Sequence, residues 1–136
     1  MRVGARLDGS RVLIVEDEAM IAALLESILT EVGCSIVGPV PTVNRAMETI
    51  ERGKIDAAVL DVRVNGDEVY PIADRLRESH IPIVFVTGYS QQDLRAGYRH
   101  HAYISKPFDP EAVVTQLEKV LQLRERENGY LAKPAG

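Results

Sequence analysis

The sequence has 136 residues, with little cysteine, no excess of positive charge and no long hydrophobic run. Its single cysteine, Cys34, cannot form an internal disulfide, which is typical of a reducing compartment, so we expect a cytoplasmic protein. No uninterrupted apolar segment approaches the roughly 18 residues that a membrane-spanning helix needs. The N-terminal residues also lack the apolar core of a signal peptide. We therefore expect neither export nor a membrane partner.

The charge balance excludes another class of protein. Sixteen Lys and Arg residues against twenty Asp and Glu residues give a formal net charge of −4. A protein whose main task is to bind a nucleic-acid backbone needs a basic face, so we expect no nucleic-acid partner. The hydrophobic fraction of 46% and the charged fraction of 26% are ordinary for a soluble globular domain.

Short apolar runs alternate with helical patterns along the chain. The apolar runs predict five buried strands, at residues 11–15, 34–37, 55–60, 82–86 and 102–105. Apolar residues at helical spacing predict a helix after each strand, and the last helix begins near Asp109. The expected fourth helix, over residues 90–99, holds only Leu94 and Ala96 as clear apolar helix formers, and Gly97 interrupts it.

This alternation predicts an α/β fold, a doubly wound parallel sheet with helices on both faces. The length predicts one domain. We divide the chain into a flexible leader at residues 1–9, a domain at 10–123 and a C-terminal tail at 124–136. The tail is expected either to extend the last helix or to be disordered.

Polar side chains of a coherent kind follow the predicted strands. Glu16 and Asp17 follow the first strand, and Asp61, Thr87 and Lys106 follow the third, fourth and fifth. The carboxyl ends of parallel strands share one edge of the sheet, where ligands bind. Carboxylate oxygens suit Mg²⁺, and a carboxylate can accept a phosphoryl group whose oxygens a lysine and a hydroxyl then hold. The residues therefore predict a phosphoryl-transfer site that uses Mg²⁺.

Four segments resemble, in order and spacing, the motifs of bacterial response-regulator receiver domains of two-component systems. They are residues 12–18, 58–61, 84–88 and 104–108. The resemblance covers about residues 10–123 and implies a flavodoxin-like (βα)5 fold with strand order 2-1-3-4-5. It implies a single-domain response regulator that takes a phosphoryl group from a sensor histidine kinase or phosphotransfer protein. Its only expected activities are Mg²⁺-dependent self-phosphorylation and slow self-dephosphorylation.

The resemblance also implies roles for individual residues. Asp61 would be the phosphoacceptor, and Lys106 and Thr87 would contact the phosphoryl group. The Mg²⁺ ligands would be Glu16, Asp17, Asp61 and the backbone carbonyl of Arg63. Tyr103 would switch together with Thr87, and the peptide bond before Pro107 would be cis.

The expected output is a phosphorylation-dependent contact with a downstream protein. The face would be formed by the fourth helix, the fifth strand and the fifth helix, and a homodimer through the same helices is an option. The weak helical pattern at residues 90–99 suggests that this segment is mobile before phosphorylation. Two departures from the family pattern lie nearby: residues 62–66 lack the usual proline, and residues 85–89 only approximate the Phe-x-Thr-Gly-x-Tyr signature of a stand-alone subgroup.

Two other functions stay open on the residues alone. The chain could be a receiver-fold interaction or scaffold module that is never phosphorylated, although the complete set of acids, hydroxyl and lysine argues against it. It could be a metal-dependent phosphatase, but such an enzyme needs a general acid near Asp61. The position two residues further on is Arg63, which does not donate a proton usefully.

Overall fold

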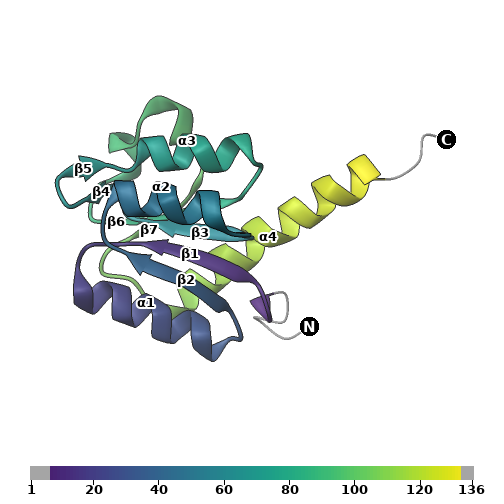
Figure 1. The fold of residues 1–136 in the computed structure, drawn as a ribbon, viewed down its shortest axis with the longest axis horizontal. Helices are drawn as coiled ribbons and strands as arrows, with labels where there is room; N and C mark the ends of the chain where they lie inside the picture. The colour runs from purple at the N-terminus through teal and green to yellow at the C-terminus, as the bar shows by residue number, and fades with distance from the viewer. Residues whose placement is uncertain (1–6, 133–136) are drawn as a thin grey trace.

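The computed structural model describes residues 7–132 of the chain, and side chains up to residue 126. Its centre is a five-stranded sheet in the order β2-β1-β3-β6-β7 (Figure 1). The strands are β1 (Arg11–Val15), β2 (Ser35–Val40), β3 (Ala57–Leu60), β6 (Ile83–Thr87) and β7 (Ala102–Ser105). Every neighbouring pair is parallel. The predicted doubly wound fold with flavodoxin-like strand order is therefore confirmed.

Helices cover both faces of this sheet. Helices α1 (Ala19–Glu31) and α4 (Pro110–Ala132) lie on one face, and α2 (Val43–Arg52) and α3 (Tyr70–Glu78) lie on the other (Figure 1). Successive side chains of a strand point to opposite faces, so each strand supplies both layers of the core. In β1, Leu13 packs with the residues under α2 and α3, while Ile14 packs with those under α1 and α4.

The signals that end and begin the helices act as the sequence indicates. The hydroxyl of Thr42 accepts a hydrogen bond from the backbone N–H of Arg45 at 3.2 Å and caps α2. Gly53 ends that helix, and Pro71 lies in the first turn of α3, where its missing N–H costs nothing. Gly33 follows α1 with a φ of +94°, a left-handed conformation that favours glycine.

The predicted helix at residues 90–99 is wrong. The structure has two short 3₁₀ turns there, η2 (Gln91–Asp93) and η3 (Ala96–Tyr98). The backbone N–H of Arg95 donates to the hydroxyl of Tyr70 at 2.9 Å, and the Tyr98 hydroxyl donates to Asp74 at 2.5 Å. These bonds to α3 hold the segment in a conformation that its own weak helical propensity does not oppose.

Two further elements differ from the expectation. Strand β2 does not end before Gly38 but continues to Val40 through a β-bulge that contains the cis Gly38–Pro39 bond. After β3 the chain forms a small antiparallel hairpin, β4 (Arg63–Val64) and β5 (Asp67–Glu68), instead of a plain loop. Its turn places Asn65 and Gly66 at positive φ, as a two-residue hairpin turn requires.

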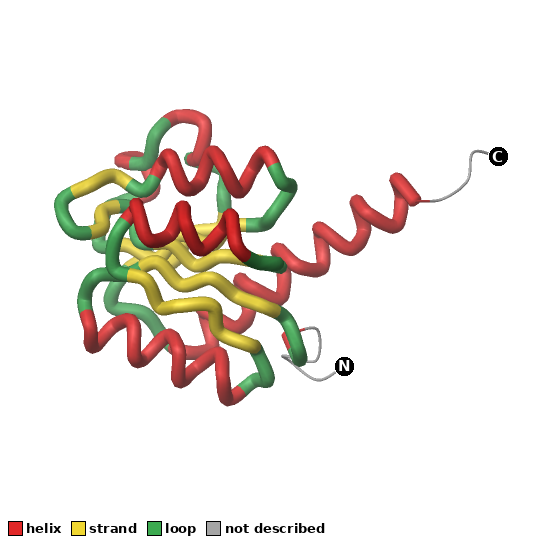
Figure 2. Tube along the Cα trace, viewed as in Figure 1, coloured by secondary structure: helices red, strands yellow, loops and turns green. Residues whose placement is uncertain are grey.

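The two ends of the described chain are more ordered than their polar composition suggests. Leu7 is fully buried in the core, so packing begins before the expected boundary at residue 10. Helix α4 continues to Ala132 and projects beyond the sheet (Figure 2). Residues 1–6 and 133–136, which belong to the expected leader and tail, lie outside the described residues. Between residues 7 and 132, no helix combines the length and the apolar character that crossing a membrane requires.

Candidate functional site

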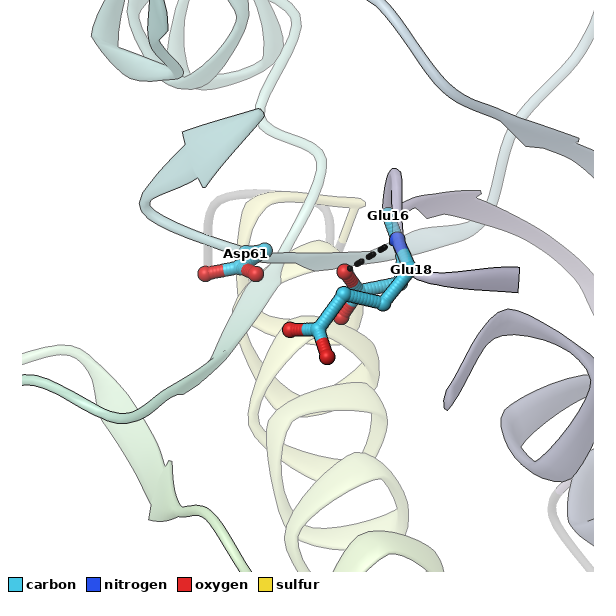
Figure 3. A group of neighbouring side chains, drawn as sticks. All are labelled: Glu16, Glu18 and Asp61. Carbon is cyan, nitrogen blue, oxygen red and sulfur yellow. Dashed lines mark hydrogen bonds between the residues drawn. The ribbon is translucent and has the colours of Figure 1, made fainter. Parts of the chain in front are cut away.

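Three carboxylates gather where the central strands end. Glu16 and Glu18 follow β1, Asp61 follows β3, and one oxygen from each lies within 4.8 Å of the others (Figure 3). The backbone N–H of Glu18 donates to Glu16 Oε2 at 3.1 Å, which fixes the Glu16 side chain. Glu16 and Asp61 are buried, at 3% and 7% exposure. Buried acids are rare unless they are paired, so this cluster needs a compensating group.

Lys106 supplies that compensation. It follows β7, and its backbone N–H donates to the carbonyl of Thr87 at 2.9 Å. Its ammonium donates to Glu16 Oε1 at 2.7 Å, to Asp61 Oδ2 at 2.9 Å and to Glu18 Oε1 at 3.2 Å. All three hydrogens of the ammonium therefore have a carboxylate acceptor. The structure thus brings the three side chains predicted from separate strands, Glu16, Asp61 and Lys106, into direct contact.

Burial and charge change the acidity of this group of residues. Burial, opposed by the hydrogen bond from Lys106, raises the pKa of Glu16 to about 7. Burial lowers the pKa of Lys106, but its hydrogen bonds to Glu16 and Asp61 outweigh that effect and hold the pKa above its usual value. Lys106 is therefore a permanent cation beside the carboxylate of Asp61.

Asp17 lies outside this cluster. Its side chain is exposed, and its carboxylate accepts a hydrogen bond from the backbone N–H of Asn65 at 2.8 Å. The carboxylate that joins Glu16 and Asp61 instead is that of Glu18, a residue for which the sequence predicts no role. The only signal for Glu18 is its place in the same acidic run, because the turn after β1 decides which side chain faces Asp61.

The remaining predicted residues lie around the cluster. Thr87 ends β6, is fully buried, and its hydroxyl accepts a hydrogen bond from the backbone N–H of Tyr89 at 3.2 Å. Tyr103 lies half-buried in β7, and its hydroxyl donates to the backbone carbonyl of Tyr89. Arg63 lies in β4 with an exposed side chain, two residues after Asp61. The Lys106–Pro107 peptide bond is cis.

The chemistry of the cluster fits a hard cation. Its donors are carboxylate oxygens without sulfur or imidazole, and such donors suit Mg²⁺ better than zinc. Asp61 combines an exposed fraction of 7% with a fixed cationic neighbour, so one carboxylate oxygen is positioned while the side chain still reaches the surface. This arrangement can bind a metal and receive an electrophile such as a phosphoryl group.

A parallel five-stranded sheet with an acidic cluster and a lysine at its carboxyl edge defines a receiver-type signalling domain. The family model for the response regulator receiver domain matches residues 12–118, and the chain belongs to that family. Receiver domains of this family serve phosphorylation-based signalling in two-component systems.

Individual relatives agree with this family. The transcriptional regulatory protein PdtaR of Mycobacterium tuberculosis is 36% identical over 112 residues, which cover 79% of this chain and 55% of that protein. The solution structure of SdrG from Sphingomonas melonis Fr1 is 38% identical, covers 83% of this chain and 97% of that one, and has a TM-score of 0.75. The response regulator PhyR from Brucella abortus is 25% identical, covers 95% of this chain and 54% of that one, and has a TM-score of 0.83. The chain spans about half the length of the curated relatives that it matches.

Proposed function

We propose that this chain receives a phosphoryl group on Asp61 from a histidine kinase or phosphotransfer protein and then signals by binding another protein. The observation that carries this proposal is the ammonium of Lys106, which lies 2.9 Å from Asp61 Oδ2 and 2.7 Å from Glu16 Oε1. A nucleophilic carboxylate needs a fixed cation beside it, because the transferred group brings negative charge to the same place.

The transfer step uses groups of this chain and one partner histidine. A carboxylate oxygen of Asp61 attacks the phosphorus of the partner's phosphohistidine, the new P–O bond forms, and the P–N bond breaks. The electron pair of that bond leaves with the imidazole, which takes up a proton. Lys106 then holds a phosphoryl oxygen, and Thr87 donates its hydroxyl hydrogen to another after releasing the N–H of Tyr89. Water later hydrolyses the acyl phosphate slowly, which restores the carboxylate and releases inorganic phosphate.

The metal in this proposal is Mg²⁺. When bound, it neutralises charge on the phosphoryl oxygens as the group is transferred. The proposed ligands are Glu16, Asp17, Asp61 and the backbone carbonyl of Arg63, and Glu18 is added because its carboxylate lies in the cluster. Asp17 can join after exchanging its hydrogen bond with the N–H of Asn65.

The proposed output is a change in the face that includes η2, η3, β7 and α4. Movement of Thr87 toward the phosphoryl group changes the position of the β6–β7 connection, and Tyr103 is linked to that connection through the carbonyl of Tyr89. The downstream target is a protein that binds this face in one of the two states. We propose that the chain acts in the cytoplasm as a stand-alone regulator. A homodimer through the same face stays a prediction.

Phosphorylation is tested with Mg²⁺ and acetyl phosphate, followed by the intact mass of the protein. We expect wild type to gain the mass of one phosphoryl group only when Mg²⁺ is present, and Asp61→Asn to gain none. Asp67→Asn is the matched control, because it removes an exposed acid from β5, in the hairpin that follows Asp61 along the chain. A wild-type protein that is never modified would favour the alternative of an unphosphorylated scaffold module, and equal modification of Asp61→Asn would overturn the assignment of the acceptor.

A further inference from the structure

A second charged region lies at the opposite end of the sheet, where β6 and β7 begin. A cavity of about 670 Å³ opens between the end of α3, the segment before β7 and the outer half of α4. We call it the basic groove and define it by the residues Arg77, His80, His100, His101, Leu123 and Arg124. These include all three histidines of the chain. Among the described residues that line the groove, none carries a carboxylate.

Neutral groups hold the two guanidinium groups of the basic groove in place. The Arg77 guanidinium lies 5.0 Å from the centre of the Tyr98 ring. Arg124 donates from one guanidinium nitrogen to the backbone carbonyl of Asp56 at 2.6 Å. The ring and the peptide carbonyl orient the guanidinium groups without carrying a charge themselves. The carboxylate of Asp74, whose pKa is lowered by the hydrogen bond from Tyr98 and by the charges of Arg95 and Arg77, offsets part of the Arg77 charge, but it does not line the groove, so the groove lining keeps a positive charge.

Apolar residues lie between the positive groups. Ile81, Pro82 and Val120 line the same cavity, and Leu123 is 56% exposed beside Arg124. An exposed leucine that lines the same cavity as two arginines is a favourable contact for an apolar side chain that is flanked by acids. A simple inorganic anion would use the charges but none of this apolar surface.

The backbone of His80, one of the residues that line the basic groove, has an unusual conformation. It follows the end of α3 with a φ of 58°, a left-handed conformation in which glycine is favoured and other side chains are strained. The backbone N–H of His80 donates to the carbonyl of Arg77 at 3.0 Å. The backbone N–H of Ile81 donates to the carbonyl of Leu76 at 2.9 Å. The chain thus keeps an imidazole where glycine would serve the turn better, and strain of this kind collects at functional sites.

The two guanidinium groups of the basic groove come from different elements, Arg77 from α3 and Arg124 from α4, and both line the same cavity of about 670 Å³. The histidines do not form a three-ligand metal site: within residues 7–126, the acidic cluster at the other edge is the only group of three or more metal-type ligands whose ligand atoms lie within 4.8 Å of one another. An extended ligand with several separated charges therefore fits better than a compact ion.

We propose that the basic groove binds an acidic segment of a partner protein, in which Asp or Glu residues flank an aliphatic side chain. The aliphatic side chain packs against Leu123 and Val120, and the carboxylates lie near Arg77 and Arg124. This extends the proposed output face toward the amino ends of the strands, and it rests on the proposed function only in taking the partner to be a protein. The groove is present without modification of Asp61.

The test selects peptides from a displayed random library on the immobilised full-length chain. We expect selected sequences to place Asp or Glu beside an aliphatic residue, and we expect this consensus to be lost on Arg77→Gln/Arg124→Gln. The matched control is Arg45→Gln/Arg52→Gln, which removes the same charge from exposed positions of α2. The selected peptide should bind the groove variant at least about tenfold more weakly than wild type or the control.

Further variants sharpen this result. Leu123→Glu places a carboxylate in the basic groove and should also weaken the peptide, while His80→Gly should weaken it although it relieves the strained backbone. The proposal is overturned if no acidic consensus appears, or if the groove variant selects the same peptides. It is also overturned if inorganic phosphate or a single-stranded oligonucleotide perturbs the amide resonances of the groove while the peptide does not. Selection on Asp61→Asn separates the two proposals, because the acidic consensus should survive there even if phosphorylation never occurs.

Discussion

The two ends of the sheet both gather charge, but they hold it in opposite ways. At the carboxyl ends, Glu16 and Asp61 are buried, and their charge is matched by the ammonium of Lys106. At the amino ends, Arg77 and Arg124 are oriented by an aromatic ring and a backbone carbonyl. A buried, matched set is organised for chemistry at one atom. A more open set, with no carboxylate among the described residues that line its cavity, is organised for contact with a charged surface.

We expect the largest effect from removing the cation that balances the buried carboxylates of Glu16 and Asp61. Lys106→Met leaves the carboxylates of Glu16 and Asp61 without their cation, and breaking a buried pair costs about 3 kcal/mol of unfolding free energy. We expect urea unfolding to show this loss and acetyl phosphate labelling to fail. The exposed Lys119→Met on α4 serves as the control and should retain both. If Lys106→Met/Glu16→Gln is as unstable as the single variant, the loss does not come from the unpaired Glu16.

Cys34 precedes β2 at the amino edge of the sheet, and its side chain is buried there, unlike the open groove at the same edge. Burial, together with the charge of Asp8, raises the pKa of its thiol to about 11. Relative to a thiol with the ordinary pKa of 9.0, the fraction of thiolate at pH 8 is reduced about 100-fold. We expect iodoacetamide to alkylate the native protein at least that much more slowly than the urea-unfolded protein.

The raised pKa of Cys34 also makes the unfolding free energy depend on pH. The folded state keeps the proton that the unfolded state loses, so the unfolding free energy should fall as the pH rises from 9 toward 11. Cys34→Ser should lack both the alkylation and this part of the slope. Equal alkylation of native and unfolded protein would show that the thiol is not protected.

Tyr98 is fully buried, and its ring packs against the Arg77 guanidinium of the basic groove. Tyr98→Phe keeps the ring and removes the hydroxyl that donates to Asp74 at 2.5 Å. A hydrogen bond to a charged group contributes about 1.5 kcal/mol, and we expect that loss in urea unfolding. The exposed Tyr89→Phe is the control. A loss as small as that of the control would mean that the hydroxyl does not hold η3 on α3.

The smallest effect concerns His101 in the basic groove. Burial, and then the nearby charge of Arg77, lowers its pKa. The unfolded chain therefore takes up this proton more readily, and the stability contributed by neutral His101 should be lost as the pH falls below about 6.5. Urea unfolding between pH 8 and pH 5.5 should show a shallower decline for His101→Asn than for wild type. The exposed His100→Asn should decline as wild type does.

The sequence could predict the positions of Glu16, Asp61 and Lys106 because each follows a strand of a parallel sheet, and strand ends share an edge. It could not tell Asp17 from Glu18, because that depends on the Asn65 amide in a hairpin 48 residues away. The helix predicted over residues 90–99 does not form, for a similar reason. Leu94 and Tyr98 have helical spacing and are both buried, but Tyr70 and Asp74 of α3 bind the segment in another conformation. Local patterns predict elements well where no distant side chain competes for the backbone.

A small tilt of helix α4 would displace its far end much more than its near end. It begins four residues after Lys106 and runs for 23 residues, a rod of about 34 Å at 1.5 Å per residue. Its inner half packs on the sheet through Val113 and Leu117, whereas its outer half projects beyond the sheet (Figure 2). A tilt of about 10° at the inner end would carry the tip roughly 6 Å. If Asp61 receives the phosphoryl group as proposed, a small displacement near Lys106 would be carried along this rod to its far end.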